Sequence, residues 1–147
     1  MKRLIFLYGI RFQEDGRVDV FPAVEISVLG RRGKGMYAAF HIDSGATTSI
    51  VPLSDAAVLG LPVDQGKRTF VRGISGEPLQ GYRHIVAVRL GEEKLRIPFI
   101  FVDDRQVPRI LGREGVFTSF AVVFDEVRRR TAFFDSVTAQ RMIDESV

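Results

Sequence analysis

Alternation of apolar and polar residues dominates this chain and predicts β-strands along most of its length. From Val24 to Val28, apolar residues occupy every second position, with Glu25 and Ser27 between them. This period of two is the pattern of a strand with one buried face. Pro22 interrupts the segment just before and indicates an edge or a bulge, because proline has no N–H to donate. The expected strands are 4–12, 17–29, 36–42, 67–72, 79–83, 84–90, 94–102, 109–111, 121–124 and 131–134, with a further strand starting at 49.

Helices are expected to be few and short. Segment 52–60 predicts one, with Gly60 at its C-terminal end. Segment 112–120 has helical character, and the tail 136–145 predicts a further helix. The chain has 147 residues, enough to bury a core, and it shows no linker, internal repeat or low-complexity segment. We therefore expect a single domain, 1–147, of the all-β class with short helices.

Charge and cysteine content narrow the possible functions. The net charge is +3, and the basic clusters 31–34 and 128–130 are short and fall at expected turns, so no nucleic-acid partner is expected. Because cysteine is absent, disulfides are excluded and a reducing compartment is the simple interpretation. The early apolar run 4–10 is followed by Arg11, which disfavours a signal peptide. No run reaches the roughly 18 apolar residues that cross a bilayer, so we expect a soluble, cytoplasmic protein with no membrane partner.

One strand is expected to end directly on an acidic residue, Asp43. Three small residues follow it, Ser44, Gly45 and Ala46. Aspartate is seldom buried without a partner, so a carboxylate in this position suggests a specific role. Gly45 permits a tight turn, Ala46 adds little bulk, and the Ser44 hydroxyl can bond to the backbone and fix the loop. A carboxylate held in this way could act as a general base.

Two other interpretations of the Asp43 loop remain open at this point. Asp and Ser often cap local N–H groups in ordinary turns, and an Asp-Ser/Thr-Gly triplet occurs by chance in roughly one chain of this length in ten. A metal site is the second alternative. The chain has only two histidines, His41 and His84, and they show no ligand spacing, so no metal is expected.

Two further motifs give the Asp43 loop a specific context. The segment 73–76, Gly-Ile-Ser-Gly, forms the glycine-rich tip of an expected hairpin, and Ile110-Leu111-Gly112 precedes the helical segment, with Arg113 next. With Ile42-Asp43-Ser44-Gly45-Ala46, these elements stand in the order found in the retropepsin-like aspartic proteases, which the chain resembles over roughly 18–120. The extra strand at the N-terminus and the C-terminal hairpin and helix extend beyond this family-like core.

The resemblance implies an all-β, pepsin-like closed barrel half with a flap hairpin and short helices. It also implies an aspartic endopeptidase that works as a homodimer, in which Asp43 of each copy contributes to a catalytic pair that shares one proton and activates water. Ser44, Gly45 and Ala46 would support the catalytic loop, with Ser44 joining the loops of the two copies. Arg113 would brace the loop from below. No metal or cofactor is implied.

The same resemblance gives the glycine-rich hairpin the role of a flap. Gly73, Ile74, Ser75 and Gly76 would form its tip and close over an extended peptide or protein substrate. One departure from the viral members concerns Arg113, whose usual acidic partner is replaced by Thr47. The main alternative function is a non-catalytic dimerisation or peptide-binding module that retains the protease fold. A nucleic-acid-binding barrel is a further alternative, which the scattered charge disfavours.

Overall fold

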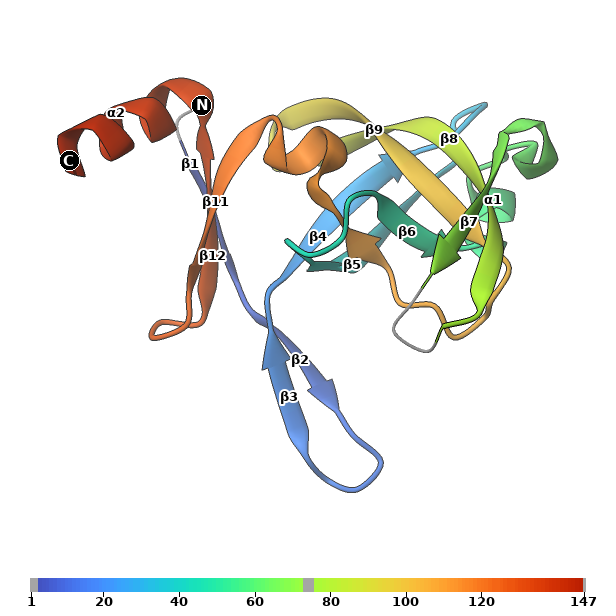
Figure 1. Ribbon diagram of the computed structural model, residues 1–147, viewed down its shortest axis with the longest axis horizontal. Helices are drawn as coiled ribbons and strands as arrows, with labels where there is room; N and C mark the ends of the chain where they lie inside the picture. Colours follow the sequence, from blue (N-terminus) through green and yellow to red (C-terminus); the bar gives the residue numbers. More distant parts are fainter. Residues whose placement is uncertain (1–2, 73–75, 147) are drawn as a thin grey trace.

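The computed structural model describes residues 3–72 and 76–146. Within these residues the chain forms a large curved sheet, a three-stranded sheet beside it, and a two-stranded hairpin that projects from the junction between them (Figure 1). The all-β class with short helices is therefore confirmed. No helix in the described part of the chain is long and apolar enough to span a bilayer.

The large sheet closes into a ring. Its strand order is β4-β5-β10-β6-β9-β8-β7, and β4 also pairs with β8, so that β7 alone lies outside the closed circuit of strands. This ring is compatible with the expected closed barrel half. Its strands are β4 (Ala23–Leu29), β5 (Gly35–Ile42), β6 (Ser49–Pro52), β7 (Lys67–Arg72), β8 (Pro78–Leu90), β9 (Glu93–Val102) and β10 (Ile110–Leu111). The short helix α1 (Ser54–Val58) and a single 3-10 turn, η1 (Val63–Gln65), connect β6 to β7.

Apolar side chains fill the interior of the ring. Val24, Ile26 and Val28 point inward from β4 and are almost fully buried, whereas Glu25 of the same strand is exposed. The predicted alternation is thus confirmed for this strand. The largest fully buried side chains include Phe40, Phe99 and Phe101, whose rings contact one another, together with Phe133 of the neighbouring sheet.

The second sheet joins the two ends of the chain. Strand β12 (Arg130–Asp135) lies between β1 (Arg3–Leu7) and β11 (Phe120–Asp125), and both pairings are antiparallel. Phe133 makes edge-to-face contacts with Phe6 and Phe120 of its own sheet. Phe120 and Phe133 belong to the same apolar core as the buried residues of the ring. Helix α2 (Ser136–Ser146) continues from β12 and has no buried residue within it.

Two long strands predicted from the sequence are each divided in the structure. The expected strand 4–12 is wrong, because Tyr8 separates β1 from β2 (Gly9–Phe12), which belongs to another sheet. The expected strand 17–29 divides at Pro22 into β3 (Val18–Phe21) and β4. Pro22 supplies no N–H to a ladder, and at this residue the chain passes from the projecting hairpin into the ring.

Two other regions of the chain also differ from the structure expected for them. Segments 79–83 and 84–90 form one continuous strand, β8, because β9 pairs with it from Gly81 to Leu90 without a break. The expected helix 112–120 shortens to a turn, η2 (Arg113–Phe117), in which Glu114 and Gly115 have non-helical backbone angles. The φ of Gly115 is +81°, and a Cβ there would lie 2.3 Å from Ile97 Cγ2, so the turn packs directly against β9.

Candidate active site

The Asp43 loop lies where three strands meet. Strand β10 runs between β5 and β6, parallel to β5 and antiparallel to β6. Asp43 follows the last residue of β5, and its N–H donates to the Leu111 carbonyl at 2.9 Å. The chain then leaves the sheet at Ser44 and returns as β6 at Ser49. The loop is therefore held at both ends by the strands that flank β10, and the Asp43 side chain is half-buried between them.

Within the loop, Gly45 orients the carboxylate. The N–H of Gly45 donates to Asp43 Oδ1 at 2.8 Å, and the N–H of Ala46 donates to the Asp43 carbonyl at 3.3 Å. A Cβ on Gly45 would lie 3.2 Å from the same Oδ1, so glycine allows this close approach. Ala46 is half-buried, and Ser44 is exposed at the surface of the loop.

The Leu111-Gly112-Arg113 segment supports the loop through its backbone. Gly112 N–H donates to the hydroxyl of Ser49 at 3.0 Å, and Arg113 N–H donates to the Ala46 carbonyl at 2.9 Å. A Cβ on Gly112 would lie 2.7 Å from the Thr48 carbonyl oxygen and 2.8 Å from that of Ala46. Only glycine fits so close to two backbone oxygens. This contact gives a physical reason for the glycine of the Ile-Leu-Gly motif.

Ser49 is a supporting residue that the sequence analysis missed. Its side chain is fully buried, and its hydroxyl accepts the Gly112 N–H across 63 positions of the chain. The available signal was a polar residue at the start of the apolar segment Ser49-Ile50-Val51. Ser44, which was expected to pin the loop, is instead the exposed serine.

Arg113 contacts the loop through its guanidinium as well as its backbone. Its Nη2 donates to Thr47 Oγ1 at 3.3 Å. The partner of Arg113 is therefore Thr47, the residue that replaces the acidic partner expected from the viral members. The next residue, Glu114, accepts from Thr48 Oγ1 at 3.2 Å and pairs with Arg83 of β8 at 3.4 Å. Both members of that ion pair are more than a third exposed, so its stabilisation is modest. Neither Glu114 nor Arg83 was singled out from the sequence.

A pocket of about 700 Å³ opens beside Asp43. One wall is the Asp43 loop, and the other is the end of β7. Its lining residues are Asp43, Gly45, Ala46, Thr47, Thr48, Ile50, Phe70, Val71, Arg72, Ile100 and Ile110. The loop contributes Asp43, Thr47 and Thr48 and β7 contributes Arg72, and the remaining lining residues are largely aliphatic or aromatic. Phe70 is 63% exposed, so part of this apolar surface is open to a ligand.

Strand β7, one strand of the expected flap hairpin, contributes to this pocket. Strand β7 pairs with β8 from Lys67 to Arg72, and Phe70, Val71 and Arg72 line the pocket. The predicted tip residues Gly73, Ile74 and Ser75 lie outside the described residues. Gly76, the fourth, has a φ of +90°, a conformation that favours glycine.

An ion pair between a buried aspartate and a partly exposed arginine lies at the start of β10. Asp55 in α1 is 4% exposed and accepts two hydrogen bonds from Arg109, at 2.7 Å and 2.9 Å. The hydrogen bond to Asp55 raises the pKa of Arg109, so the guanidinium stays charged. The Arg109 carbonyl accepts the N–H of His41 at 2.9 Å, and the next residue, Ile110, lines the Asp43 pocket. No local pattern of residues indicates this pair.

Neither histidine takes part in the Asp43 site. His41 points away from the interior and its ring lies 5.0 Å from that of Phe21, whereas His84 Nε2 lies 2.8 Å from the Val63 carbonyl oxygen. Within residues 3–72 and 76–146, no group of three or more His, Asp or Glu side chains is arranged to hold a metal ion.

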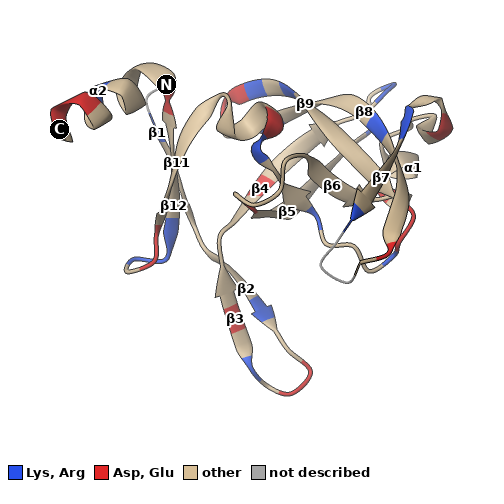
Figure 2. Ribbon diagram, viewed as in Figure 1, with Lys and Arg blue, Asp and Glu red and all other residues tan. Residues whose placement is uncertain are grey.

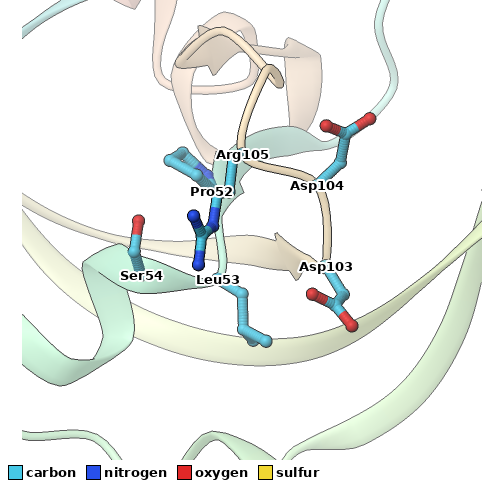
Figure 3. Close-up of a pocket in the computed structure, with 6 residues that line it drawn as sticks. All are labelled: Pro52, Leu53, Ser54, Asp103, Asp104 and Arg105. Atoms are coloured by element: carbon cyan, nitrogen blue, oxygen red, sulfur yellow. The ribbon is translucent and has the colours of Figure 1, made fainter.

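A second pocket, of about 230 Å³, lies at the end of β9 (Figure 3). Asp103 and Asp104 line it, but their carboxylates point in different directions, and Arg105 lies on the other side (Figure 3). Asp104 Oδ1 accepts the N–H of Gln106 at 2.8 Å, the role of an aspartate that caps a turn. The charged groups of this pocket do not converge on one point (Figure 3).

A β-ring that delivers one aspartate to an apolar pocket is an arrangement suited to an aspartic protease half. A family model described as "Aspartyl protease" matches residues 24–114, which is more than half of the chain. The chain therefore belongs to the aspartyl protease family. A comparison with curated protein sequences finds no match.

Comparison with solved structures finds retropepsins among the similar chains. A retropepsin-like aspartic protease from Rickettsia conorii is 18% identical, with a TM-score of 0.60 over 89% of this chain and 89% of that one. The EIAV protease, solved with the inhibitor HBY-793, is also 18% identical, with a TM-score of 0.48 over 63% of this chain and 82% of that one. The likeness to the Rickettsia conorii protease shows a retropepsin-like fold, as the sequence predicted.

Proposed function

We propose that this chain is an aspartic endopeptidase in which Asp43 activates the attacking water. The observation that carries the proposal is the geometry of Asp43: a half-buried carboxylate, oriented by the Gly45 N–H, that opens into an apolar pocket. Because Oδ1 already accepts the Gly45 N–H, Oδ2 is the oxygen that we assign to the water. Membership of the aspartyl protease family supports this assignment.

A second copy of the chain would complete the site. Each chain carries one Asp-Ser-Gly motif, and a two-fold axis would bring the two Asp43 carboxylates together. Two carboxylates in contact cannot both ionise readily, so the pair would share one proton and titrate as a unit. The ionised member would take a proton from water as it attacks the peptide carbonyl, and the protonated member would stabilise the oxyanion; the leaving amine is then protonated.

The substrate would be an extended peptide lying between the Asp43 loop and β7. Strand β7 is the outermost strand of its sheet, so its free edge can bind a peptide by strand addition. Ile50, Phe70, Ile100 and Ile110 line the pocket and would favour apolar residues next to the scissile bond. The tip residues 73–76 would close over the peptide as a flap, and no cofactor takes part.

The other predicted residues would act on the loop and not on the substrate. Exposed Ser44 would contact its counterpart in the second copy. Gly45 would present its N–H to the carboxylate, Ala46 would accept the Arg113 N–H, and Arg113 would hold Thr47 from the opposite side. The roles of Gly45, Ala46 and Arg113 are supported by their contacts within one chain.

Cleavage of a mixed peptide library, read by mass spectrometry from about pH 4 to about pH 7, tests the proposal across the range of a shared-proton pair. Wild type and Asp43→Asn are compared, with Asp103→Asn as a matched control in the other pocket. We expect cuts by wild type and the control and none by Asp43→Asn. Cuts by all three proteins would refute the role of Asp43. No cuts by any of them, from a protein that dimerises, would favour a non-catalytic peptide-binding or dimerisation module.

A further inference from the structure

The hairpin formed by β2 and β3 (residues 9–21, here called the arm) projects away from both sheets (Figure 1). Its register pairs Ile10 with Val20 and Phe12 with Val18. Neighbouring residues of a strand point to opposite sides, so these four side chains share one face, here called the arm face. The opposite side carries Arg11 and Asp19, which also pair with each other in the register.

The arm face is exposed although it is entirely apolar. Phe12 is 80% exposed, Ile10 62% and Val18 51%. Charged residues lie on the strands and around the tip of the hairpin (Figure 2), so the arm is amphipathic. A two-stranded hairpin on its own is marginally stable in water, and contiguous exposed apolar surface typically marks an interaction site. The arm is therefore built to be covered.

The base of the arm is attached to the residues that precede Asp43. Pro22, directly after β3, accepts the N–H of Ile42 at 3.0 Å. Phe21 packs against His41 with ring centroids 5.0 Å apart, and the Arg11 guanidinium lies 4.8 Å from the centre of the Phe21 ring. A partner that bound the arm would therefore contact a hairpin attached to His41 and Ile42, the two residues of β5 that directly precede Asp43.

A further apolar surface begins at the base of the arm. A groove of about 420 Å³ runs from Gly9 between β1 and the β4–β5 pair, and Leu7 and Tyr37, which are 78% and 67% exposed, line it. Exposed apolar side chains therefore lie both on the arm face and in a groove that begins at the base of the arm. The arm also lies outside the 24–114 segment that matches the family model, so the pairing of family members in general does not account for it.

We propose that a second copy of this chain covers the arm face, and that this contact holds the two Asp43 loops in register. The choice of partner rests on the proposed function, because a site with one aspartate per chain is incomplete without a second copy. The apolar character of the arm face suits burial in a permanent dimer interface. Its attachment beside Asp43 explains why the same contact would also align the two half-sites.

Sedimentation equilibrium of Phe12→Ser and Arg11→Ser tests the proposal. The two positions are adjacent but lie on opposite faces of the arm, so Arg11→Ser is the matched control. Loss of one buried phenylalanine should raise the dimer Kd about tenfold or more. A symmetric dimer carries every substitution twice, so Phe12→Ser should raise the dimer Kd about 100-fold or more. Arg11→Ser should change it by less than about fivefold. Circular dichroism and Tm show whether each variant is folded.

Peptide cleavage separates this inference from the proposed function. If the inference holds, Phe12→Ser loses activity at low protein concentration and recovers it when the concentration is raised above its own dimer Kd. An unchanged Kd for folded Phe12→Ser, or a wild type that remains monomeric up to about 1 mM, would overturn the inference, whether or not the protein cleaves peptides. A dimer that depends on Phe12 but cleaves nothing would support the inference and refute the proposed function instead. As a second measurement, Val18→Ser should repeat the effect of Phe12→Ser.

Discussion

Removal of either member of the Asp55–Arg109 pair should destabilise the protein, but by unequal amounts. The two groups make a two-point contact at 2.7 Å and 2.9 Å, yet the Asp55 side chain is only 5% exposed and that of Arg109 is 38% exposed. Arg109→Ala leaves a buried carboxylate without its cation, which costs about 3 kcal/mol. Asp55→Ala leaves a guanidinium that water can still reach, and we expect about 1 to 2 kcal/mol.

A short but exposed ion pair provides the control. Arg17 Nε and Asp15 Oδ2 are 2.6 Å apart, and the two side chains are 79% and 52% exposed. Arg17→Ala should therefore cost less than about 1 kcal/mol, because water already solvates both groups. Both pairs join an arginine to an aspartate at nearly the same shortest distance, so the comparison tests burial together with the second hydrogen bond that Asp55 accepts.

Urea denaturation at neutral pH measures all three variants and the Asp55→Ala/Arg109→Ala double variant. The double variant should cost less than the sum of the singles by about 2 kcal/mol, because it leaves neither charge unpaired. Equal losses for the two single variants would refute the reasoning from burial. A loss for Arg17→Ala as large as that for Arg109→Ala would show that distance alone sets the strength of these pairs.

Four other substitutions address the loop, the pocket and alkaline stability. Gly112→Ala forces a Cβ against two backbone oxygens at 2.7 Å and 2.8 Å, so kcat should fall about 100-fold or more. Full activity of Gly112→Ala would contradict the role of this contact. Ser49→Ala should mainly lower the free energy of unfolding, by about 1 to 3 kcal/mol. Phe70→Ala should raise KM more than it lowers kcat, and an unchanged KM would remove Phe70 from the substrate site. Burial, followed by the hydrogen bond to Glu126, raises the pKa of Tyr8 from 10.0 to about 12. Tyr8 thus stabilises the fold below about pH 10 and loses this contribution as the pH rises toward 12, so Tyr8→Phe should flatten the fall in Tm over that window; an equally steep fall would contradict it.

The sequence predicted those features that depend on neighbouring residues. The alternation at Val24, Ile26 and Val28 identified the buried face of β4, because a pleated strand turns every second side chain to the same side. The end of β5 before Asp43 was also predictable, since small residues with turn preference follow it directly. The same local signals located the β11–β12 hairpin and helix α2.

Features that depend on distant residues could not be predicted in this way. Nothing near Tyr8 signals that β1 and β2 belong to different sheets, because both continue an apolar pattern. Ser49 and Gly112 are 63 positions apart, and Asp55 and Arg109 are 54 positions apart. Each of these contacts depends on how the ring closes. A buried polar side chain in such a ring needs a partner, but the sequence does not say which.

The support of the Asp43 loop comes more from backbone groups than from side chains. Leu111, Ala46 and Thr47 each offer a carbonyl that accepts an N–H from the facing segment, at 2.9 Å, 2.9 Å and 2.8 Å. These bonds depend on the close approach at Gly112 and not on the charge at position 47. Thr47 can therefore replace the acidic residue of the viral proteases while Arg113 keeps its backbone contact. The backbone bonds that hold the Asp43 loop therefore do not involve the side chain of Thr47.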